Sequence, residues 1–207
     1  MRLKRSERGD TIIEVLFAVA VFAMVAVGAM AIMNQGTSIA QRSLEITQVR
    51  QQIDAQTEAL RYIHQAYVAS YQRGGTPTGT AAQWADITTD YGAAGASDFS
   101  QLANGSTCPT NVPGERPFIL NARQATISNV SPSMAPPTGG SLPPFAAVSY
   151  NDDSSVNRVY GIWIEAIPVT ATNGTGFVDF HIRACWDSPG SSVPTTLGTI
   201  VRLYEPK

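Results

Sequence analysis

The stretch that decides the fold of this chain is VLFAVAVFAMVAVGAMAIM, residues 15–33. All 19 positions are apolar, and no charged residue occurs between Glu14 and Arg42. As an α-helix with a rise of about 1.5 Å per residue, this stretch would be about 28 Å long, close to the hydrocarbon thickness of a bilayer. The sequence therefore predicts a helix that spans a membrane.

The first nine residues are basic. They contain one acidic residue, Glu7, and four cations: Arg2, Lys4, Arg5 and Arg8. Because positively charged flanks of membrane helices remain on the cytoplasmic side, residues 1–9 are expected in the cytoplasm. We expect a single pass through the cell membrane, with everything after about residue 35 outside.

Three other interpretations of residues 15–33 compete with this one. A soluble core helix this apolar would need more surrounding protein than 207 residues provide. A cleaved secretory signal peptide fits the small-x-small triplet at residues 29–31, and a plain single-pass anchor fits the length. A signal peptide gives no role to the carboxylates of Asp10 and Glu14, which precede the apolar run, and a plain anchor leaves Glu14 unexplained.

Glu14 is the informative residue of this region. A carboxylate next to an apolar membrane segment is costly to bury unless it finds a partner, so such residues mark functional sites. If the chain is cut after Gly9, the new amino group of Asp10 lies four residues before Glu14, on the same face of a helix. Cation and anion can then neutralise each other, within one subunit or between two.

Residues 8–16, RGDTIIEVL, resemble the processing and assembly signal of type IV pilins and pseudopilins. The shared features are a basic leader, a glycine before the cut, a threonine with two aliphatic residues, a glutamate and a long apolar helix. The resemblance implies cleavage by a prepilin peptidase after Gly9 and methylation of the Asp10 amino group. It also implies that the helix leaves membrane lipid to pack in a filament core, where Glu14 pairs with the amino terminus of another pilin subunit.

The chain departs from this family pattern at Asp10, where phenylalanine is usual. The carboxylate of Asp10 gives the mature terminus one extra negative charge, so the amine and Glu14 no longer cancel each other completely. The resemblance covers residues 1 to about 70 and does not extend to the rest of the chain.

Residues 36–73 are predicted to continue the helix in an amphipathic form. Apolar side chains recur at spacings of three, four and seven residues: Ile46, Val49, Ile53, Leu60, Ile63 and Tyr67. Gln56 is the one polar member of this face. The charged residues are expected mostly on the opposite, solvent-facing side: Arg42, Glu45, Arg50, Asp54, Glu58 and Arg61.

Beyond residue 73 the composition changes. Residues 74–116 are rich in Gly, Ala, Ser and Thr and are expected to form a connecting segment. Strand-forming runs follow at residues 118–121, 126–130, 145–150, 158–167, 177–186 and 197–204. Within 177–186 the even-numbered side chains are expected to face the core and the odd-numbered ones to face outward.

These patterns predict an α+β, pilin-like fold, in which a long N-terminal helix packs on an antiparallel sheet. The expected division is a cytoplasmic leader (1–9), a transmembrane and filament-core helix (10–35), an amphipathic helix (36–73), the connecting segment (74–116) and the sheet head (117–207).

The two cysteines, Cys108 and Cys185, do not form a metal-binding pattern with the two histidines. In a head outside the cytoplasm they are expected to form a disulfide, the alternative being two separately buried thiols. We expect neither a metal ion nor another cofactor. The triplet Asn151-Asp152-Asp153 indicates a turn rather than a calcium loop, because it lacks spaced acidic ligands.

Charge and histidine content argue against two function classes. After the leader, 10 cations face 15 anions, so nucleic acid is not expected as a partner, since phosphate binding needs clustered Lys and Arg. His64 and His181 are the only histidines, and neither lies in a recognisable nucleophile motif. We therefore expect no enzymatic activity.

The expected function is a structural subunit, major or minor, of a type IV pilus or related filament. The nearest alternative is a pseudopilin of a secretion system. A non-polymerising, membrane-anchored binding module is an alternative of another class, and a secreted domain is a third. A mature N-terminus at Asp10, Met1 or Ile32 would indicate the filament subunit, the anchor or the secreted domain. Adhesion, motility, DNA uptake and secretion share this helix, so the sequence does not choose between them.

Overall fold

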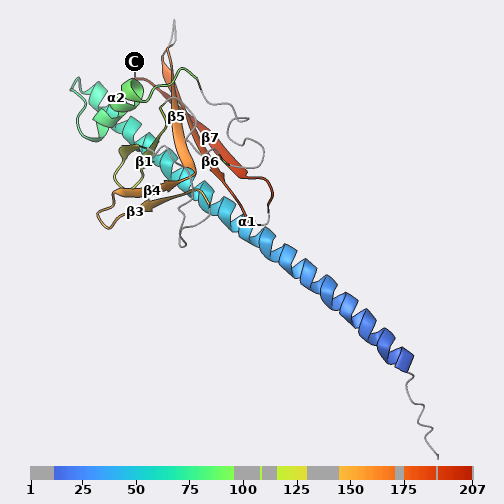
Figure 1. Ribbon diagram of the computed structural model, residues 1–207. Coiled ribbons are helices and arrows are strands. Elements are labelled where there is room, and N and C mark those ends of the chain that lie inside the picture. The colour runs from blue at the N-terminus through green and yellow to red at the C-terminus, as the bar shows by residue number, and fades with distance from the viewer. Residues whose placement is uncertain are drawn as a thin grey trace, which may run out of the picture. The chain divides into compact units, whose positions relative to one another are not determined.

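The computed structural model describes residues 12–95, 108, 116–129, 145–170, 175–189 and 191–206. The chain divides into two compact units, residues 1–41 and 42–207. Helix α1 (Ile12–Gln72) has 61 residues and contributes to both units. The second unit, which we call the head, also contains helix α2 (Thr80–Asp90) and the strands (Figure 1).

The described part of the head contains seven strands: β1 (Phe118–Asn121), β2 (Thr126–Asn129), β3 (Ala147–Tyr150), β4 (Val156–Tyr160), β5 (Ile162–Val169), β6 (Phe177–Trp186) and β7 (Thr195–Tyr204). Five of them form an antiparallel sheet in the order β2-β1-β5-β6-β7. The hairpin β3-β4 forms a separate two-stranded sheet. The predicted strand 177–186 coincides with β6.

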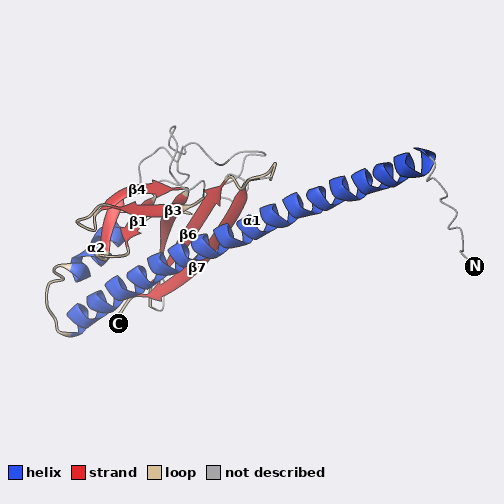
Figure 2. Ribbon diagram, turned by 90° about the horizontal axis from the view of Figure 1, so that it is seen from below, coloured by secondary structure: helices blue, strands red, loops and turns tan. Residues whose placement is uncertain are grey.

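The head portion of α1 lies along the five-stranded sheet (Figure 2). Its buried side chains form one stripe along the helix: Glu45, Val49, Ile53, Gln56, Thr57, Ala59, Leu60 and Ile63. The apolar members belong to the same core cluster as Phe180 and Ile182 of β6, whose side chains face this helix. The α+β class predicted from the sequence, a long N-terminal helix with an antiparallel sheet, is therefore confirmed.

Two glutamines of the helices complete the hydrogen bonding of the β1-β2 hairpin. Gln56 of α1 accepts from the Leu120 backbone N–H (2.7 Å) and donates to the Leu120 carbonyl (2.7 Å). The register pairs Leu120 with Ile127, whose N–H donates to Oε1 of Gln83 of α2 (2.8 Å). The polar residue on the predicted apolar face of α1 thus takes the place of a neighbouring strand.

The structure differs from the prediction in the connecting segment. Residues 80–90 form α2, whose Trp84 and Ile87 are buried in the core. Trp84 packs on Phe180 with ring centroids 5.7 Å apart. The prediction of a plain connection over 74–116 was incomplete, because the segment TAAQWADITTD contains too few apolar residues to show a helical period clearly.

A second difference lies at Gly161. The predicted strand 158–167 is two strands, β4 and β5, which belong to different sheets. Gly161 has φ +57°, and a Cβ at this position would lie 2.1 Å from the Cys185 carbonyl oxygen. Only glycine fits this left-handed position, so the chain changes sheet there although the sequence on both sides is β-prone.

Candidate functional site

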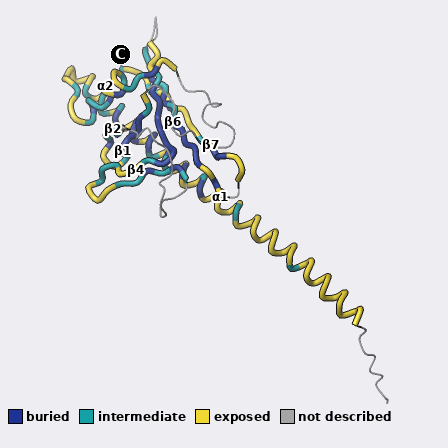
Figure 3. The backbone as a smooth tube through the Cα atoms, viewed as in Figure 1, coloured by how far each residue is buried: buried dark blue, intermediate teal, exposed yellow. Residues whose placement is uncertain are grey.

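The first candidate site is the surface of α1 over residues 12–41, considered by itself. Its large apolar side chains are exposed: Phe22 is 74% and Met24 76% exposed. In Figure 3 most of this stretch has the yellow colour of exposed residues. The helix is long and apolar enough to cross a membrane, and none of its most apolar window is buried. A signal sequence would pass the same test. An exposed apolar surface of this size needs lipid or protein to cover it.

Glu14 lies in the first turn of α1 and is exposed. A carboxylate is favourable at this end because the helix dipole is positive there. Glu14 forms no ion pair with any described residue. The predicted cleavage and methylation residues, Gly9 and Asp10, lie outside the described residues, as does the amino group that Glu14 is predicted to bind.

The second candidate site is the face of the sheet that points away from α1. Cys185 of β6 is joined there to Cys108 by a disulfide, with a Cα–Cα distance of 5.8 Å. This is the pairing that the sequence predicts. The bond attaches the segment after α2 to β6 across a sequence separation of 77 residues.

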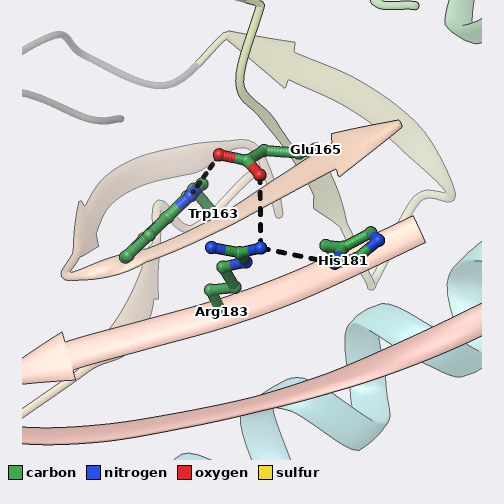
Figure 4. A network of polar contacts seen from close by, with 4 residues as sticks. All are labelled: Trp163, Glu165, His181 and Arg183. Atoms are coloured by element: carbon green, nitrogen blue, oxygen red, sulfur yellow. Dashed lines mark hydrogen bonds and ion pairs between the residues drawn. The ribbon is translucent and has the colours of Figure 1, made fainter. Parts of the chain in front are cut away.

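A network of polar side chains lies on the same face, between β5 and β6 (Figure 4). Arg183 forms an ion pair with Glu165 (3.8 Å) and contacts Nδ1 of His181 (3.3 Å). The indole N–H of Trp163 donates to Glu165 (3.4 Å). The side chains of Glu165 and Arg183 are 2% and 4% exposed. A buried ion pair of this kind holds only while both partners remain, because removing one leaves a buried charge.

Arg183 and Cys185 point outward, as predicted, but both are buried. The outward face of the sheet is therefore covered near the C-terminal end of β6, and the side chains there are buried on both faces of the sheet. Strand alternation predicted the direction of these side chains but could not show what lies over them. Glu165, inside the apolar run of β5, was the sequence signal for this network, which was not predicted.

His181 lies at the edge of this network. Burial, and secondarily the positive charge of Arg183, lower its pKa below the usual value, while Glu165 and Asp179 act in the opposite direction. On the neighbouring strand β7, Arg202 donates two hydrogen bonds to Asp179, of 2.7 and 2.8 Å. These bonds lower the pKa of the Asp179 carboxyl.

Glu45 of α1 is a buried carboxylate in the head. Its Oε2 accepts hydrogen bonds from the indole N–H of Trp186 (3.1 Å) and from the Ser188 hydroxyl (2.6 Å). The prediction that Glu45 lies on the solvent side was wrong. Glu45 precedes Val49 by one helical turn and therefore belongs to the buried stripe.

The groups considered for catalysis or metal binding have other contacts. His64 Nε2 is hydrogen-bonded to the Tyr204 carbonyl (2.7 Å), and its ring packs 4.8 Å from Trp84. Neither His64 nor His181 is hydrogen-bonded to a serine, threonine or cysteine side chain of the described residues. Those residues contain no group of three metal-binding side chains. The carboxylate of Asp153 accepts from Ser155 within the predicted turn.

No protein-family model, no curated protein and no solved structure matches this chain. Its function is therefore inferred from its own residues.

Proposed function

We propose that this chain is a structural subunit of a type IV pilus or a related filament, processed after Gly9. The observation that carries the proposal is the sequence RGDTIIE, residues 8–14, directly before an exposed apolar helix segment. A secretory signal or a plain anchor needs the apolar segment but has no use for the carboxylates of Asp10 and Glu14. A filament subunit uses both the cut and a charge at the start of the helix.

The mechanism is polymerisation. Before assembly, lipid covers the apolar side chains of residues 12–33. On assembly the same side chains pack against those of other subunits, so the helix exchanges one apolar environment for another at little cost. Glu14 sets the axial register between the helices of neighbouring subunits, because its carboxylate is costly in an apolar bundle unless a neighbouring amino terminus lies beside it.

The head supplies the part that the filament displays. Glu45 and Gln56, in the head portion of α1, form hydrogen bonds with Ser188 and Leu120, which are far away in the sequence. These bonds specify the register between helix and sheet in a way that apolar contacts alone do not. The sheet therefore has one defined orientation relative to residues 42–72 of α1.

Processing is tested with Gly9→Leu. The peptidase must accept the residue before the cut with almost no side chain, so this variant should keep its leader and stay out of filaments. The matched control is Gly28→Ala, where a Cβ meets nothing within 4 Å. N-terminal sequencing and electrophoretic mobility are the measurements. Maturation of Gly9→Leu at the parental site, or a parental mature N-terminus at Met1 or Ile32, would refute the proposal.

Assembly is tested with Glu14→Val, in a strain that produces the variant as its only copy. We expect mature protein in the membrane but little in sheared surface filaments, because the attraction to a neighbouring amino terminus is lost. Asp152→Val is the control, since Asp152 is an exposed carboxylate in the head. Equal incorporation of Glu14→Val and the parent would limit Glu14 to the cleavage signal. Absence of the parent from sheared filaments would favour the pseudopilin alternative.

A further inference from the structure

The two edges of the five-stranded sheet are treated differently. The β2 edge has four residues. The N–H of Ile127 faces away from β1 and donates a hydrogen bond to the side chain of Gln83 of α2. The β7 edge has ten residues, Thr195 to Tyr204. Long unprotected edges promote pairing with other chains, and natural proteins usually block them. The β7 edge therefore requires an explanation.

The free backbone groups of β7 are identified by the alternation of an antiparallel ladder. The Glu205 N–H donates to the Gly176 carbonyl, so residues 203, 201 and 199 also direct their backbone groups toward β6. Residues 198, 200, 202 and 204 direct theirs away from the sheet. The Tyr204 carbonyl is bound by His64. No described residue binds the outward backbone groups of Gly198, Ile200 and Arg202.

A groove of about 520 Å³ runs beside this edge, between β7 and α1. Residues 199–203 line one side, and Asp54, Thr57, Glu58 and Arg61 line the other. Thr57 is 7% exposed, and its Oγ1 is buried without a hydrogen-bond partner among the residues that the structure describes. A buried hydroxyl without a partner is unfavourable unless a ligand supplies one. The groove thus contains a polar group that the described part of the chain does not satisfy.

The charges of the groove indicate the sign of the partner. Glu58 and Arg61 neutralise each other through a 2.6 Å ion pair. Asp54 is exposed and forms no ion pair with a described residue. Arg202 also lines the groove, and its charge is neutralised by Asp179. Asp54 is therefore the carboxylate of the lining that no described cation pairs with, and a cationic side chain would match it.

We propose that the β7 edge binds an extended segment of a partner polypeptide that carries a basic side chain. The partner segment forms a sixth strand beside β7 and pairs with the N–H and C=O groups of Gly198, Ile200 and Arg202. Its side chains on the α1 face supply a hydrogen-bond partner to Thr57 and a cation to Asp54. Free backbone groups on every second residue suit another strand and no small molecule, which is why the occupant is a polypeptide.

The proposal is tested by hydrogen exchange on the full-length, ¹⁵N-labelled chain in detergent micelles. The probe is the synthetic peptide acetyl-Thr-Val-Lys-Val-Thr-Val-Lys-Val-Thr-amide, titrated to about 1 mM. We expect the amides of residues 198, 200 and 202 to gain protection, whereas those of 199, 201 and 203 are protected from the start by β6. A peptide with Glu in place of Lys should bind more weakly, and one with proline at alternate positions should give no protection.

Two variants separate the site from the fold. Asp54→Asn should weaken binding of the Lys peptide about three- to five-fold, as expected for one surface ion pair. It should leave the binding of a peptide with Thr in place of Lys unchanged. Thr57→Val should weaken both peptides without destabilising the head, because it removes a hydroxyl that has no partner. Asp152→Asn, an exposed turn residue, is the control.

Failure of the peptide to protect residues 198, 200 and 202 at 1 mM would overturn the proposal. So would equal binding of the Lys peptide by the parent and Asp54→Asn. Protection of the same amides that depends on protein concentration, without peptide, would identify a second copy of this chain as the occupant and would also overturn it. All of these results are independent of whether Gly9 is cleaved.

Discussion

The two halves of helix α1 obey different rules although the helix is a single element. Over residues 12–41 the large apolar side chains are exposed, and the charged residue is Glu14 in the first turn. Over residues 42–72 one stripe of apolar side chains is buried, although Leu44 and Tyr62 stay exposed, and the charged residues include Glu45, which is buried and hydrogen-bonded. Helical propensity is therefore not what distinguishes the halves.

The difference teaches that each half is built for its own surroundings. The first half carries its apolar residues all round, as a helix covered on every side by lipid or protein does. The second half carries one buried stripe and satisfies the polar residues within it through the sheet. Substitutions should therefore affect head stability strongly in the second half and weakly in the first.

Removal of the disulfide should have the largest effect on the head. In the entropy model, loss of a crosslink between Cys108 and Cys185 costs about 4.5 kcal/mol of unfolding free energy. The measurement is urea unfolding of the double serine variant in mild detergent. Tryptophan fluorescence reports on the head alone, because all three tryptophans, Trp84, Trp163 and Trp186, lie there.

Retention of the double serine variant in carbonate-washed membranes is the internal control, since nothing in residues 12–41 changes. A midpoint in urea equal to that of the parent would contradict this prediction. Labelling of either cysteine in parental protein that was alkylated without reduction would contradict the bond itself.

The same substitution in each half provides the most direct test of the comparison. Leu60→Ala removes a side chain that is fully buried, and it should lower the unfolding free energy of the head by about 3 kcal/mol. Leu16→Ala removes a side chain that is 63% exposed and should change that energy by less than about 0.5 kcal/mol. Urea unfolding of both variants checks this. Similar losses in the two variants would abolish the distinction between the halves.

The hydrogen bonds of Gln56 give a smaller effect. Gln56→Leu fits the apolar stripe but leaves the buried N–H and C=O of Leu120 unpaired, so it should cost about 2 kcal/mol. Gln48→Leu, on the exposed side of the same half, is the matched control and should be nearly neutral. Crystallographic or NMR evidence that β1 stays paired as before, together with unchanged stability in Gln56→Leu, would show that the strand does not need this side chain.

The smallest effect concerns pH. The pKa of His181 is lowered in the folded head, so its contribution to stability is complete above the unfolded pKa of about 6.5 and is lost as pH falls through the folded pKa. The unfolding free energy of the parent should therefore decline from pH 7.5 to pH 5, and His181→Gln should reduce this slope. Residual slope at lower pH comes from Asp179 and Asp153, whose lowered pKa values make their contributions vanish in acid. Identical slopes in both proteins would show that His181 does not contribute to the pH dependence of stability.

Much of the fold could be predicted because local pattern and tertiary packing agree there. Strand β6 alternates apolar and polar residues from Val178 to Ala184, and α1 shows an apolar period through Ile63. Gln56 could be recognised as the exceptional polar residue of its face. Its partner, the Leu120 backbone, could not, because no sequence pattern reveals where a strand lacks a neighbour.

The remaining errors have physical causes. Glu45 was predicted to face solvent because charged residues are usually exposed. Its burial is acceptable because Trp186 and Ser188, at the end of β6, donate hydrogen bonds to it. The burial of Arg183 depends on Glu165 and on the segments that cover the outer face, which sequence pattern does not reveal. The candidate site at Glu14 rests on residues 8–14 and was found from sequence alone.

Gln56 and Gln83 also have a consequence for the order in which the head folds. Each belongs to a helix, and each supplies a hydrogen bond that the β1-β2 hairpin cannot make by itself. Strands β5, β6 and β7 pair with their sequence neighbours over long, regular registers and need no helix for these bonds. We therefore expect β5-β6-β7 to be formed in the folding transition state and β1-β2 to join last, after both helices have docked. Until then the β2 edge is as open as that of β7, and the unfinished head is most prone to aggregate during this interval.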